Sequence, residues 1–426
     1  MEFKQYPSYK KSGVEWLGDV PEHWQIVRTK DIFNHRKEEA LEDDEIVTAF
    51  RDGQVTLRKN RRTDGFTNSI KEHGYQHINN GDLVIHEMDA FAGAIGVSDS
   101  SGKSTPVYTV CYAKNENINH HFYSHFFRTM AKTGFINSLA KGIRVRSTEF
   151  RWNESRNVYL AEPPKADQEK IVSFLDTETA RIDNLIAKQE KLIELLEEQR
   201  KSIISHAVTK GLNPNVPMKD SGVEWLGEVP EDWEVKRFGY IFTENKKKNI
   251  GLIETNVLSL SYGNIKEKNI DDNKGLLPES FETYQIIEPN DIVFRFTDLQ
   301  NDKRSLRNAI SKYHGIITSA YIGVKTKENA DFYNYLFRAY DLQKVFYSMG
   351  DGMRQSLKMD ELNKMPIVLP KIEAQERIVK FINEENQRIN NLVVKQKNLI
   401  EKLKEYRSSI ISHAVTGKID VREFGA

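Results

Sequence analysis

Three histidines lie close together and could bind a metal ion. His120, His121 and His125 fall in a segment with helical periodicity, where His121 and His125 would share one face because they are four positions apart. Zinc sites of the HExxH type also need a glutamate beside the first histidine, and none stands there. We therefore interpret these histidines as part of a solvated helix face and predict no metal site.

No set of residues has the spacing of a catalytic site. The segment Glu162-Pro-Pro-Lys165 resembles the Pro-Pro motif of amino-methylating enzymes, but it lacks the aromatic residue that would stack on a flipped base. No glycine-rich loop follows a predicted strand to hold a methyl donor, and no GxxxxGK[ST] loop is present to hold ATP. We therefore predict a binding protein without catalytic residues.

Basic side chains gather in loops of both halves of the sequence. These runs are interleaved with Gln, Asn, Ser and Thr. Because lysine and arginine neutralise phosphates while polar side chains read base edges, such loops are typical of a DNA interface. The alternative is a charged surface that only meets water. The candidate DNA-binding residues are Arg51, Arg58, Lys59, Arg61, Arg62, Lys141, Arg144, Arg146, Arg295, Lys303, Arg304, Arg307, Arg354 and Lys358.

The composition is that of a folded protein with two or three domains. The 426 residues include 62 Lys and Arg against 62 Asp and Glu, so the net charge indicates no partner. A single cysteine, Cys111, excludes an intrachain disulfide and fits a reducing cytosol. The N-terminus lacks the apolar core of a signal peptide, and no stretch approaches about 18 apolar residues. We expect a cytoplasmic protein without a membrane span.

The chain is a tandem duplication. The segment Ser12-Gly-Val-Glu-Trp-Leu-Gly-Asp-Val-Pro-Glu-His-Trp24 recurs at 221–233 with two substitutions, an offset of 209 residues. The segment Ser202-Ile-Ile-Ser-His-Ala-Val-Thr209 is repeated without change at 409–416, an offset of 207. A period of this length predicts that each copy is a domain with its own core.

Between the repeated ends lie two inserts of about 140 residues that have diverged almost beyond alignment. Alternating and β-branched runs predict strands, and a longer aromatic-rich segment predicts one helix in each insert. Each insert is therefore expected to be an α+β domain. The predicted strands are 45–50, 82–86 and 107–112, then 256–261, 291–296 and 318–324; the predicted helices are 120–132 and 331–347.

Each copy ends in a segment with the heptad spacing of a coiled coil. The first such segment contains no Gly or Pro from 165 to 206. A helix of roughly 40 residues is about 60 Å long, too long to lie on one small domain, so the two helices are expected to pack against each other. The predicted seam residues are Leu175, Ile182, Leu185, Leu192, Leu196 and Ile203, with Ile382, Ile389, Leu392, Leu399, Leu403 and Ile410 in the second copy.

The repeated frame resembles the DNA specificity subunit of type I restriction-modification systems. Gly-x-Val-Pro-Glu-x-Trp precedes each insert, and Ser-His-Ala-Val-Thr ends each long helix. The helices begin at Pro163-Pro-Lys-Ala-Asp-Gln-Glu169 and Pro370-Lys-Ile-Glu-Ala-Gln-Glu376. The resemblance spans essentially the whole chain, and the doubling of the frame makes it specific.

This resemblance implies the fold, the partners and the cofactors. It implies two tandem α+β target recognition domains joined by two long helices in an antiparallel coiled coil, a pseudo-twofold internal duplication. Each domain would read one half of a bipartite, asymmetric double-stranded DNA target. The chain would assemble with two modification (methyltransferase) subunits and with restriction (translocase/endonuclease) subunits. S-adenosylmethionine, ATP and Mg2+ would then bind to those partners, and this chain would bind no cofactor.

In the same way, Gly142-Ile-Arg144 and Gly352-Met-Arg354 match a Gly-x-basic loop that is common in these recognition domains. Prolines before each long helix mark the domain ends, because the residue before a proline is pushed out of the helical region. The expected domains are an N-terminal segment 1–24, recognition domain 25–164, central helix 165–209, linker 210–233, recognition domain 234–370, C-terminal helix 371–416 and tail 417–426.

Two glutamines are candidates for setting the register of the coiled coil. Gln189 and Gln396 occupy the same heptad position, flanked by Leu185 and Leu192 and by Leu392 and Leu399. Antiparallel packing is expected to bring the two amides together, because a polar residue in an apolar seam is costly without a partner. The alternative is a seam that is partly exposed at this point.

Two other functional classes stay open at this stage. An adaptor protein would keep the frame and bind other proteins through the coiled coil without DNA. A stand-alone methyltransferase or nuclease would need a cofactor motif that the sequence lacks. Salt-sensitive retention on heparin or duplex DNA would separate the DNA-binding hypothesis from the adaptor hypothesis.

Overall fold

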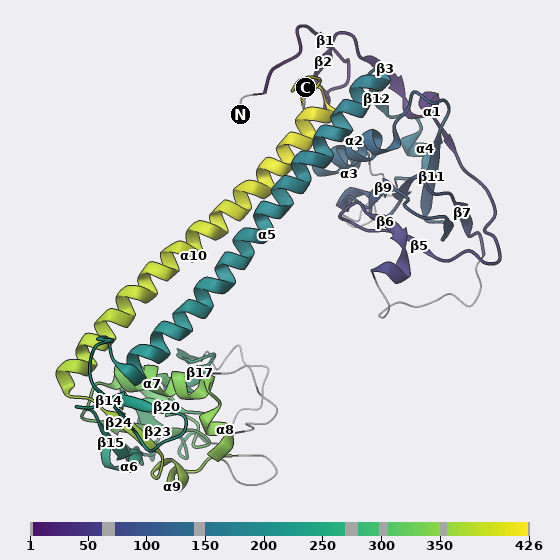
Figure 1. The fold of residues 1–426 in the computed structure, drawn as a ribbon. Coiled ribbons are helices and arrows are strands. Elements are labelled where there is room, and N and C mark those ends of the chain that lie inside the picture. Colours follow the sequence, from purple (N-terminus) through teal and green to yellow (C-terminus); the bar gives the residue numbers. More distant parts are fainter. Residues whose placement is uncertain are drawn as a thin grey trace. The chain divides into compact units, whose positions relative to one another are not determined.

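The computed structural model describes residues 3–61, 73–139, 150–268, 280–297, 306–349 and 356–424. The chain forms two compact units (Figure 1). The first unit combines Met1–Gln189 with Asn398–Ala426, and the second unit is the continuous segment Glu190–Lys397. The first unit therefore contains both ends of the chain. Within the described ranges, no helix has the length and apolarity needed to cross a membrane.

The first unit is built around a four-stranded antiparallel sheet in the order β4-β11-β8-β9. Three further antiparallel pairs, and the pair that joins insert to frame, surround this sheet. Its strands are β1 (Tyr9–Lys11) with β2 (Asp19–Pro21), β3 (Gln25–Arg28) with β12 (Tyr159–Glu162), β4 (Phe33–His35), β5 (Val47–Ala49) with β6 (Val55–Leu57), β7 (Gln76–Ile78) with β10 (Gly102–Ser104), β8 (Leu83–His86), β9 (Ile95–Val97) and β11 (Tyr108–Ala113).

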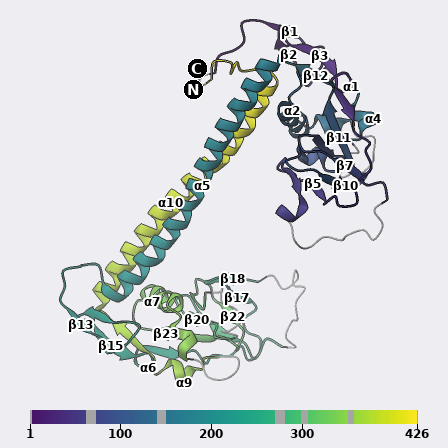
Figure 2. The same ribbon diagram turned by 45° about the vertical axis from the view of Figure 1, so that its right-hand side comes forward.

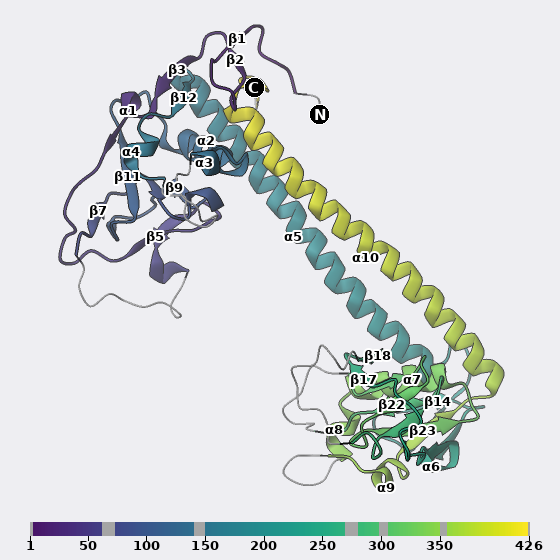
Figure 3. The ribbon, with the colours of Figure 1, turned by 180° about the vertical axis from the view of Figure 1, so that it is seen from behind.

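Helix α2 (His120–Lys132) packs on β8 and β9 (Figure 3). Its aromatic face, including Phe122 and Phe126, is fully buried, which confirms the helix predicted at 120–132. The Asn119 side chain caps it by accepting hydrogen bonds from two backbone N–H groups. The shorter helices of this unit are α1 (Thr29–Ile32), α3 (Phe135–Ser138), α4 (Trp152–Ser155) and the single 3-10 turns Arg58–Asn60 and Ala90–Ala92.

The second unit repeats this plan, with a central sheet in the order β16-β23-β20-β21. Helix α7 (Ala330–Leu342) packs against β21 and lies along the sheet (Figure 2). Its other elements are β13 (Met218–Asp220) with β14 (Glu228–Pro230), β15 (Glu234–Arg237) with β24 (Pro366–Leu369), β16 (Phe242–Glu244), β17 (Leu258–Ser261) with β18 (Asn264–Glu267), β19 (Gln285–Ile287) with β22 (Gly315–Ile317), β20 (Ile292–Phe294), β21 (Asn308–Ile310), β23 (Ile322–Thr326), α6 (Phe238–Ile241), α8 (Val345–Met349) and α9 (Met359–Leu362).

The continuous helix predicted at 331–347 is wrong at residues 343–344, where it is interrupted. Helix α7 ends at Leu342, and α8 begins only at Val345. Lys344 between them has a φ of 63°, in the left-handed region that ends a helix. The first unit makes the same break with Gly134, at a φ of 81° between α2 and α3. The second copy therefore makes this turn at a lysine, and the sequence lacks the glycine that would have predicted the end of the helix.

One buried glutamine in each copy joins the insert to the long helix that follows it. Gln168 and Gln375 are both fully buried, one turn inside α5 (Lys165–Lys210) and α10 (Ile372–Val415) respectively. Gln168 accepts a hydrogen bond from the Asn119 N–H (2.9 Å) and donates to the carbonyls of Asn117 (3.1 Å) and Pro163 (2.8 Å). This amide therefore ties the start of α5 to the cap of α2.

The equivalent Gln375 accepts from the Asn329 N–H (3.0 Å) and donates to the Pro370 carbonyl (2.9 Å). Its third hydrogen bond goes to the Glu328 carboxylate at 2.8 Å. The same buried amide thus satisfies the same kind of backbone groups in both units, where water has no access.

The inserts also share a pair of equivalent glycines, although their sequences have diverged. Gly102 begins β10 and Gly315 begins β22. A Cβ at Gly102 would lie 2.4 Å from the Glu45 carbonyl oxygen, and one at Gly315 would lie 2.5 Å from that of Asn256. The next residue in each strand donates to that same carbonyl at 2.8 Å. Glycine therefore lets the strand approach the backbone that leads into β5 or β17.

The long helices run antiparallel to each other within each unit. In the first unit Arg407 of α10 donates to Asp183 of α5 at 2.8 and 3.0 Å, and in the second Arg200 of α5 donates to Asn390 of α10 at 2.7 Å. Leu196, Ile389 and Val393 form the buried seam of the second unit. The helices predicted from 165 and 371 begin at Lys165 and Ile372.

Two predicted seam residues are wrong. Leu192 is 39% exposed and Leu399 is 41% exposed. Their neighbours Ile193 and Ile400 take the seam positions, Ile400 being buried and Ile193 packing against the seam of its unit. The physical reason is that an α-helix has 3.6 residues per turn, so an apolar stripe drifts relative to a strict heptad and passes to the next residue.

The pairing predicted for the two glutamines is not the register found within either unit. Six residues after Asp183, Gln189 comes level with Glu401, which lies six residues before Arg407. The Arg200–Asn390 bond in the second unit places Gln396 level with Glu194 in the same way. Both glutamine side chains are partly buried. Each faces a glutamate position, so mutual amide pairing does not set this register.

Candidate nucleic-acid interface

Four of the predicted DNA-binding residues lie on the β5–β6 hairpin and the turn after it. Arg51 is in the hairpin turn and its side chain is 67% exposed, with the guanidinium 2.9 Å from Asp89. Arg61 binds Asp52 with both carboxylate oxygens within 3.0 Å, and it lies 4.3 Å from the centre of the Phe50 ring. These contacts hold the arginines in place at the outer end of the hairpin.

The other two residues follow β6 directly. Arg58 donates through Nε to the Thr48 hydroxyl at 3.3 Å, and Lys59 forms an ion pair with Glu45. Ion pairs between exposed side chains contribute only about 0–1 kcal/mol, so a DNA phosphate can compete for these cations. The carboxylates therefore orient the basic side chains, which can still bind a phosphate group.

A cavity of about 650 Å³ opens beside this hairpin. The cavity is lined by residues 46–50 and by Arg51, Arg58, Arg61, Asp52, Asp89, His86, Thr105 and Tyr108. Burial lowers the pKa of His86, so its ring is neutral at pH 7. Its Nδ1 accepts the Asp89 N–H at 3.2 Å, which leaves the proton on Nε2 as a donor. Cations, neutral donors and an aromatic ring together can recognise a phosphate or a base edge.

In the second unit the prediction for Arg307 is wrong. The residue is fully buried: its backbone N–H donates to the Asp341 carboxylate at 3.1 Å, and its side-chain Nη1 donates to the Thr297 carbonyl at 3.2 Å. Its guanidinium lies 5.6 Å from the centre of the Tyr347 ring. A carbonyl and an aromatic ring therefore contact the guanidinium inside the unit, and Arg307 cannot meet DNA in this conformation.

The remaining predicted residues of the second unit have different surroundings. Lys358 is exposed and stands directly before α9, where its backbone N–H donates to Glu361 at 2.7 Å. Arg295 is partly buried, and its N–H donates to the Arg307 carbonyl at 2.8 Å. The other candidates lie outside the described residues: Arg62, Lys141, Arg144, Arg146, Lys303, Arg304 and Arg354.

Sequence reasoning missed two arginines that support the hairpins. Arg128 of α2 packs on the hairpin turn, since a Cβ at Gly53 would lie 2.4 Å from its Cζ. Arg338 of α7 donates to the Gly263 carbonyl in the β17–β18 turn at 2.5 Å. The signal was present, because Phe127-Arg128 and Phe337-Arg338 both close the aromatic helix of their copy. Each arginine links that helix to the hairpin of its own unit.

Comparison with known proteins agrees with this architecture. Residues 21–195 match the model of the type I restriction modification DNA specificity domain. The MjaVIII type I restriction enzyme specificity subunit of Methanocaldococcus jannaschii is 23% identical, over 95% of this chain and 94% of the relative. The MjaX specificity subunit of the same organism is 22% identical, over 99% of both chains.

Solved structures show the same fold. The HsdS subunit from Thermoanaerobacter tengcongensis superposes with a TM-score of 0.57 at 14% identity, covering 94% of this chain and 98% of that one. A chain from a study of complex assembly and conformational transition of the type I R-M system gives 0.62 at 13% identity, covering 93% and 98%.

Two α+β domains with one repeated frame, joined by paired long helices and carrying a DNA specificity domain, define a duplicated DNA-recognition protein. Residues 21–195 match the type I restriction modification DNA specificity domain, and over almost its whole length the chain is similar to specificity subunits of such systems. These comparisons support the specificity subunit that the repeated frame predicts.

Proposed function

We propose that this subunit reads a bipartite, asymmetric sequence in duplex DNA, with one half-site read by each unit. The observation that carries the proposal is the preserved frame with divergent inserts. Gln168 and Gln375 tie both inserts to their helices in the same way, whereas the hairpin of the first insert carries arginines that the second does not repeat. Two equal scaffolds with different loops suit a target with two different halves.

We further propose the composition of the working complex. The chain binds two modification subunits and, through them, positions restriction subunits in the cytoplasm. S-adenosylmethionine, ATP and Mg2+ bind to those partners. The coiled coil sets the number of unread base pairs between the half-sites, because its length is the distance that the two inserts must span along the duplex.

Exchange of one insert tests this proposal. Residues 25–163 are replaced by the insert of another specificity subunit, and the hybrid is expressed with the modification subunit of the same system. Sequencing of methylated positions is expected to show a new first half-site and the original second half-site, because each insert contains an apolar cluster made only of its own residues.

The reciprocal exchange of the second insert serves as the control and is expected to change only the second half-site. A folded hybrid that methylates the original complete target would contradict the division of reading between the two units.

A further inference from the structure

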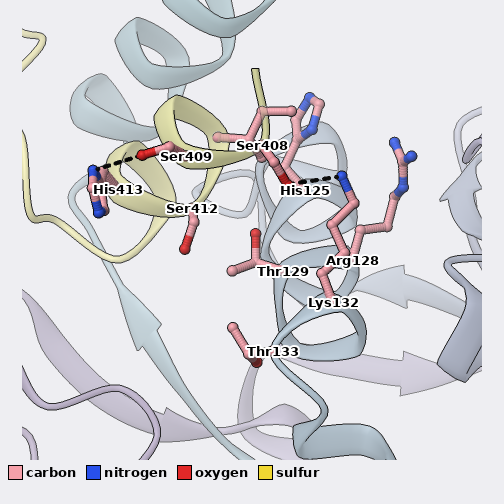
Figure 4. Close-up of a pocket in the computed structure, with 10 residues that line it drawn as sticks. His125, Arg128, Thr129, Lys132, Thr133, Ser408, Ser409, Ser412 and His413 are labelled. Carbon is pink, nitrogen blue, oxygen red and sulfur yellow. Dashed lines mark hydrogen bonds between the residues drawn. The ribbon is translucent and has the colours of Figure 1, made fainter. Parts of the chain in front are cut away.

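Helices α2 and α10 line a pocket of about 260 Å³ in the first unit (Figure 4). Lys132 points its ammonium group toward the Ser408 hydroxyl, 3.4 Å away across the pocket. Hydroxyl groups and two histidines complete the lining. The lining residues are His125, Arg128, Thr129 and Lys132 of α2, Thr133 directly after it, and Ser408, Ser409, Ile411, Ser412 and His413 of α10.

The positive charge of this pocket is not neutralised by the residues that line it. None of the lining residues that the structure describes is an aspartate or glutamate. The nearby Arg407 adds a further cation, although its guanidinium is bound to Asp183. Burial lowers the pKa of Lys132, and the charges of Arg128 and Arg407 lower it further. Such a pocket favours an anion, which would relieve this repulsion.

Two nitrogen atoms of the lining are also without partners among the described residues. The Nδ1 of His125 and the Nε of Arg128 are buried and make no hydrogen bond. An unpartnered buried polar atom costs about 1–3 kcal/mol, and such atoms are rare unless a ligand or water satisfies them. A ligand with several acceptor oxygens could accept hydrogen bonds from these nitrogens and from the Lys132 ammonium group.

Three of the lining positions on α2 carry different residues in the second unit. Lys132 corresponds to Leu342, and Thr129 corresponds to Ala339. His125 corresponds to Tyr335, whose hydroxyl lies 2.8 Å from the Asn383 side-chain oxygen and accepts from Asn386 at 3.4 Å. The fold therefore does not require a lysine or an imidazole at these two positions, because the other copy has an apolar residue and a satisfied hydroxyl there and keeps only the arginine, as Arg338.

We propose that this pocket binds a phosphate group of the DNA backbone, in addition to the bases that the loops read. The proposal rests on the proposed DNA-reading function. A phosphate offers several oxygens to the ammonium, imidazole and hydroxyl donors that surround the pocket. Arg128 also lines the pocket and packs on Gly53 of the β5–β6 hairpin, so one helix would support both the phosphate and the reading hairpin.

The test replaces Lys132 by leucine, the residue that the second copy carries. Binding of the full chain to a labelled random-sequence duplex is measured by fluorescence anisotropy over a series of KCl concentrations. Lys132→Leu is expected to weaken binding on the order of fivefold at low salt and to flatten the plot of log K against log[KCl] by about 0.9. Lys188→Leu, which removes an exposed lysine of α5 outside the pocket, is the matched control and is expected to leave the slope unchanged.

The proposal would be overturned if Lys132→Leu binds the duplex as tightly as the wild type and shows the same slope of log K against log[KCl]. If inorganic phosphate raises the Tm of the wild type but not of Lys132→Leu while both keep the same slope, the pocket holds free phosphate, and the DNA assignment is wrong. Loss of modification-subunit binding with an unchanged slope would likewise overturn it in favour of an acidic protein surface. Failure of the proposed function is distinct, because the wild type itself would then show no salt-dependent DNA binding.

Discussion

Gln168 and Gln375 have nearly the same hydrogen-bond partners in the two units, whereas His125 and Tyr335, also at equivalent positions, do not. The glutamines satisfy backbone groups that the fold itself creates where a long helix meets an insert. In contrast, the Tyr335 hydroxyl has a hydrogen-bond partner within the protein, whereas the Nδ1 of His125 has none among the described residues.

This difference separates two kinds of constraint on the duplicated chain. Positions that satisfy buried backbone groups cannot vary without cost, so they are retained in both copies. Positions on the hairpins and the α2–α10 pocket are free to differ, because the fold tolerates several solutions there. Differences between the copies therefore point to the residues that act on ligands.

Removal of either junction glutamine should have the largest effect. Gln168→Ala or Gln375→Ala leaves buried N–H and carbonyl groups without partners, and each is expected to lower the free energy of unfolding by about 3–5 kcal/mol. Urea unfolding followed by tryptophan fluorescence measures this change. Gln387→Ala is the control, because Gln387 is exposed and bonds only Asn391. If both variants unfold like Gln387→Ala, the junction is not a shared constraint.

The paired glycines should have the next largest effect. Gly102→Ala and Gly315→Ala push a Cβ into a backbone carbonyl, so each is expected to destabilise its unit by about 2–3 kcal/mol. Gly13→Ala isolates the strain of a positive φ, because nothing lies within 4 Å of a Cβ there. Thermal unfolding that affects only one of the two variants would show that the inserts do not share this device.

Two arginines predicted from the Gly-x-basic loops should act on separate halves of the target. Arg144→Ala is expected to weaken binding by about 1–3 kcal/mol and to relax only the first half-site, and Arg354→Ala only the second. Lys358→Ala, a phosphate-type contact, is expected to weaken all sequences alike. Competition with duplexes altered in one half-site measures the effect, and equal relaxation of both halves by one variant would contradict it.

The smallest expected effect concerns pH. Burial lowers the pKa of His125 to about 4, and the charges of Arg128 and His121 add to this. The unfolded chain, with a histidine pKa near 6.5, binds the proton more readily, so stability is lost as the pH falls from about 6.5 towards 4. Between pH 7.5 and 5 the loss from this residue is about 1–2 kcal/mol.

The variant His125→Tyr copies the second unit and removes this loss. Urea unfolding in phosphate-free buffer at both pH values compares the variant with the wild type. Equal pH dependence of the two proteins would show that His125 is not held neutral by burial.

The duplication and the long helices could be predicted because they leave regular signals in the sequence. Identical segments recur at almost constant spacing, and the helices lack glycine and proline over long stretches. Helix α2 was predicted from its first to its last residue because an aromatic face marks it. The break at Lys344 was missed because the residue that adopts the left-handed conformation there is not glycine.

The candidate site was harder to predict because exposure depends on distant residues. Arg307 has the same local character as the other basic residues, yet Asp341, which accepts its backbone N–H inside the core, lies 34 residues further along the chain. Leu192 and Ile193 are both apolar neighbours, and only the packing of the second helix decides which of them is buried. Arg128 was missed because its partner is the backbone of a glycine.

Residues near both ends of the sequence pack into the same hydrophobic core, that of the first unit. Ile411, Ala414 and Val415 of α10 are buried in the first unit together with Trp24, and Lys4 forms an ion pair with Glu423 at 2.8 Å. The second unit, by contrast, is one continuous segment. On the ribosome, the half that is made second can therefore complete its core first, whereas the half that is made first must wait for the last residues. An unfinished chain leaves the apolar surface around Trp24 uncovered, so premature termination exposes it to chaperones and proteases.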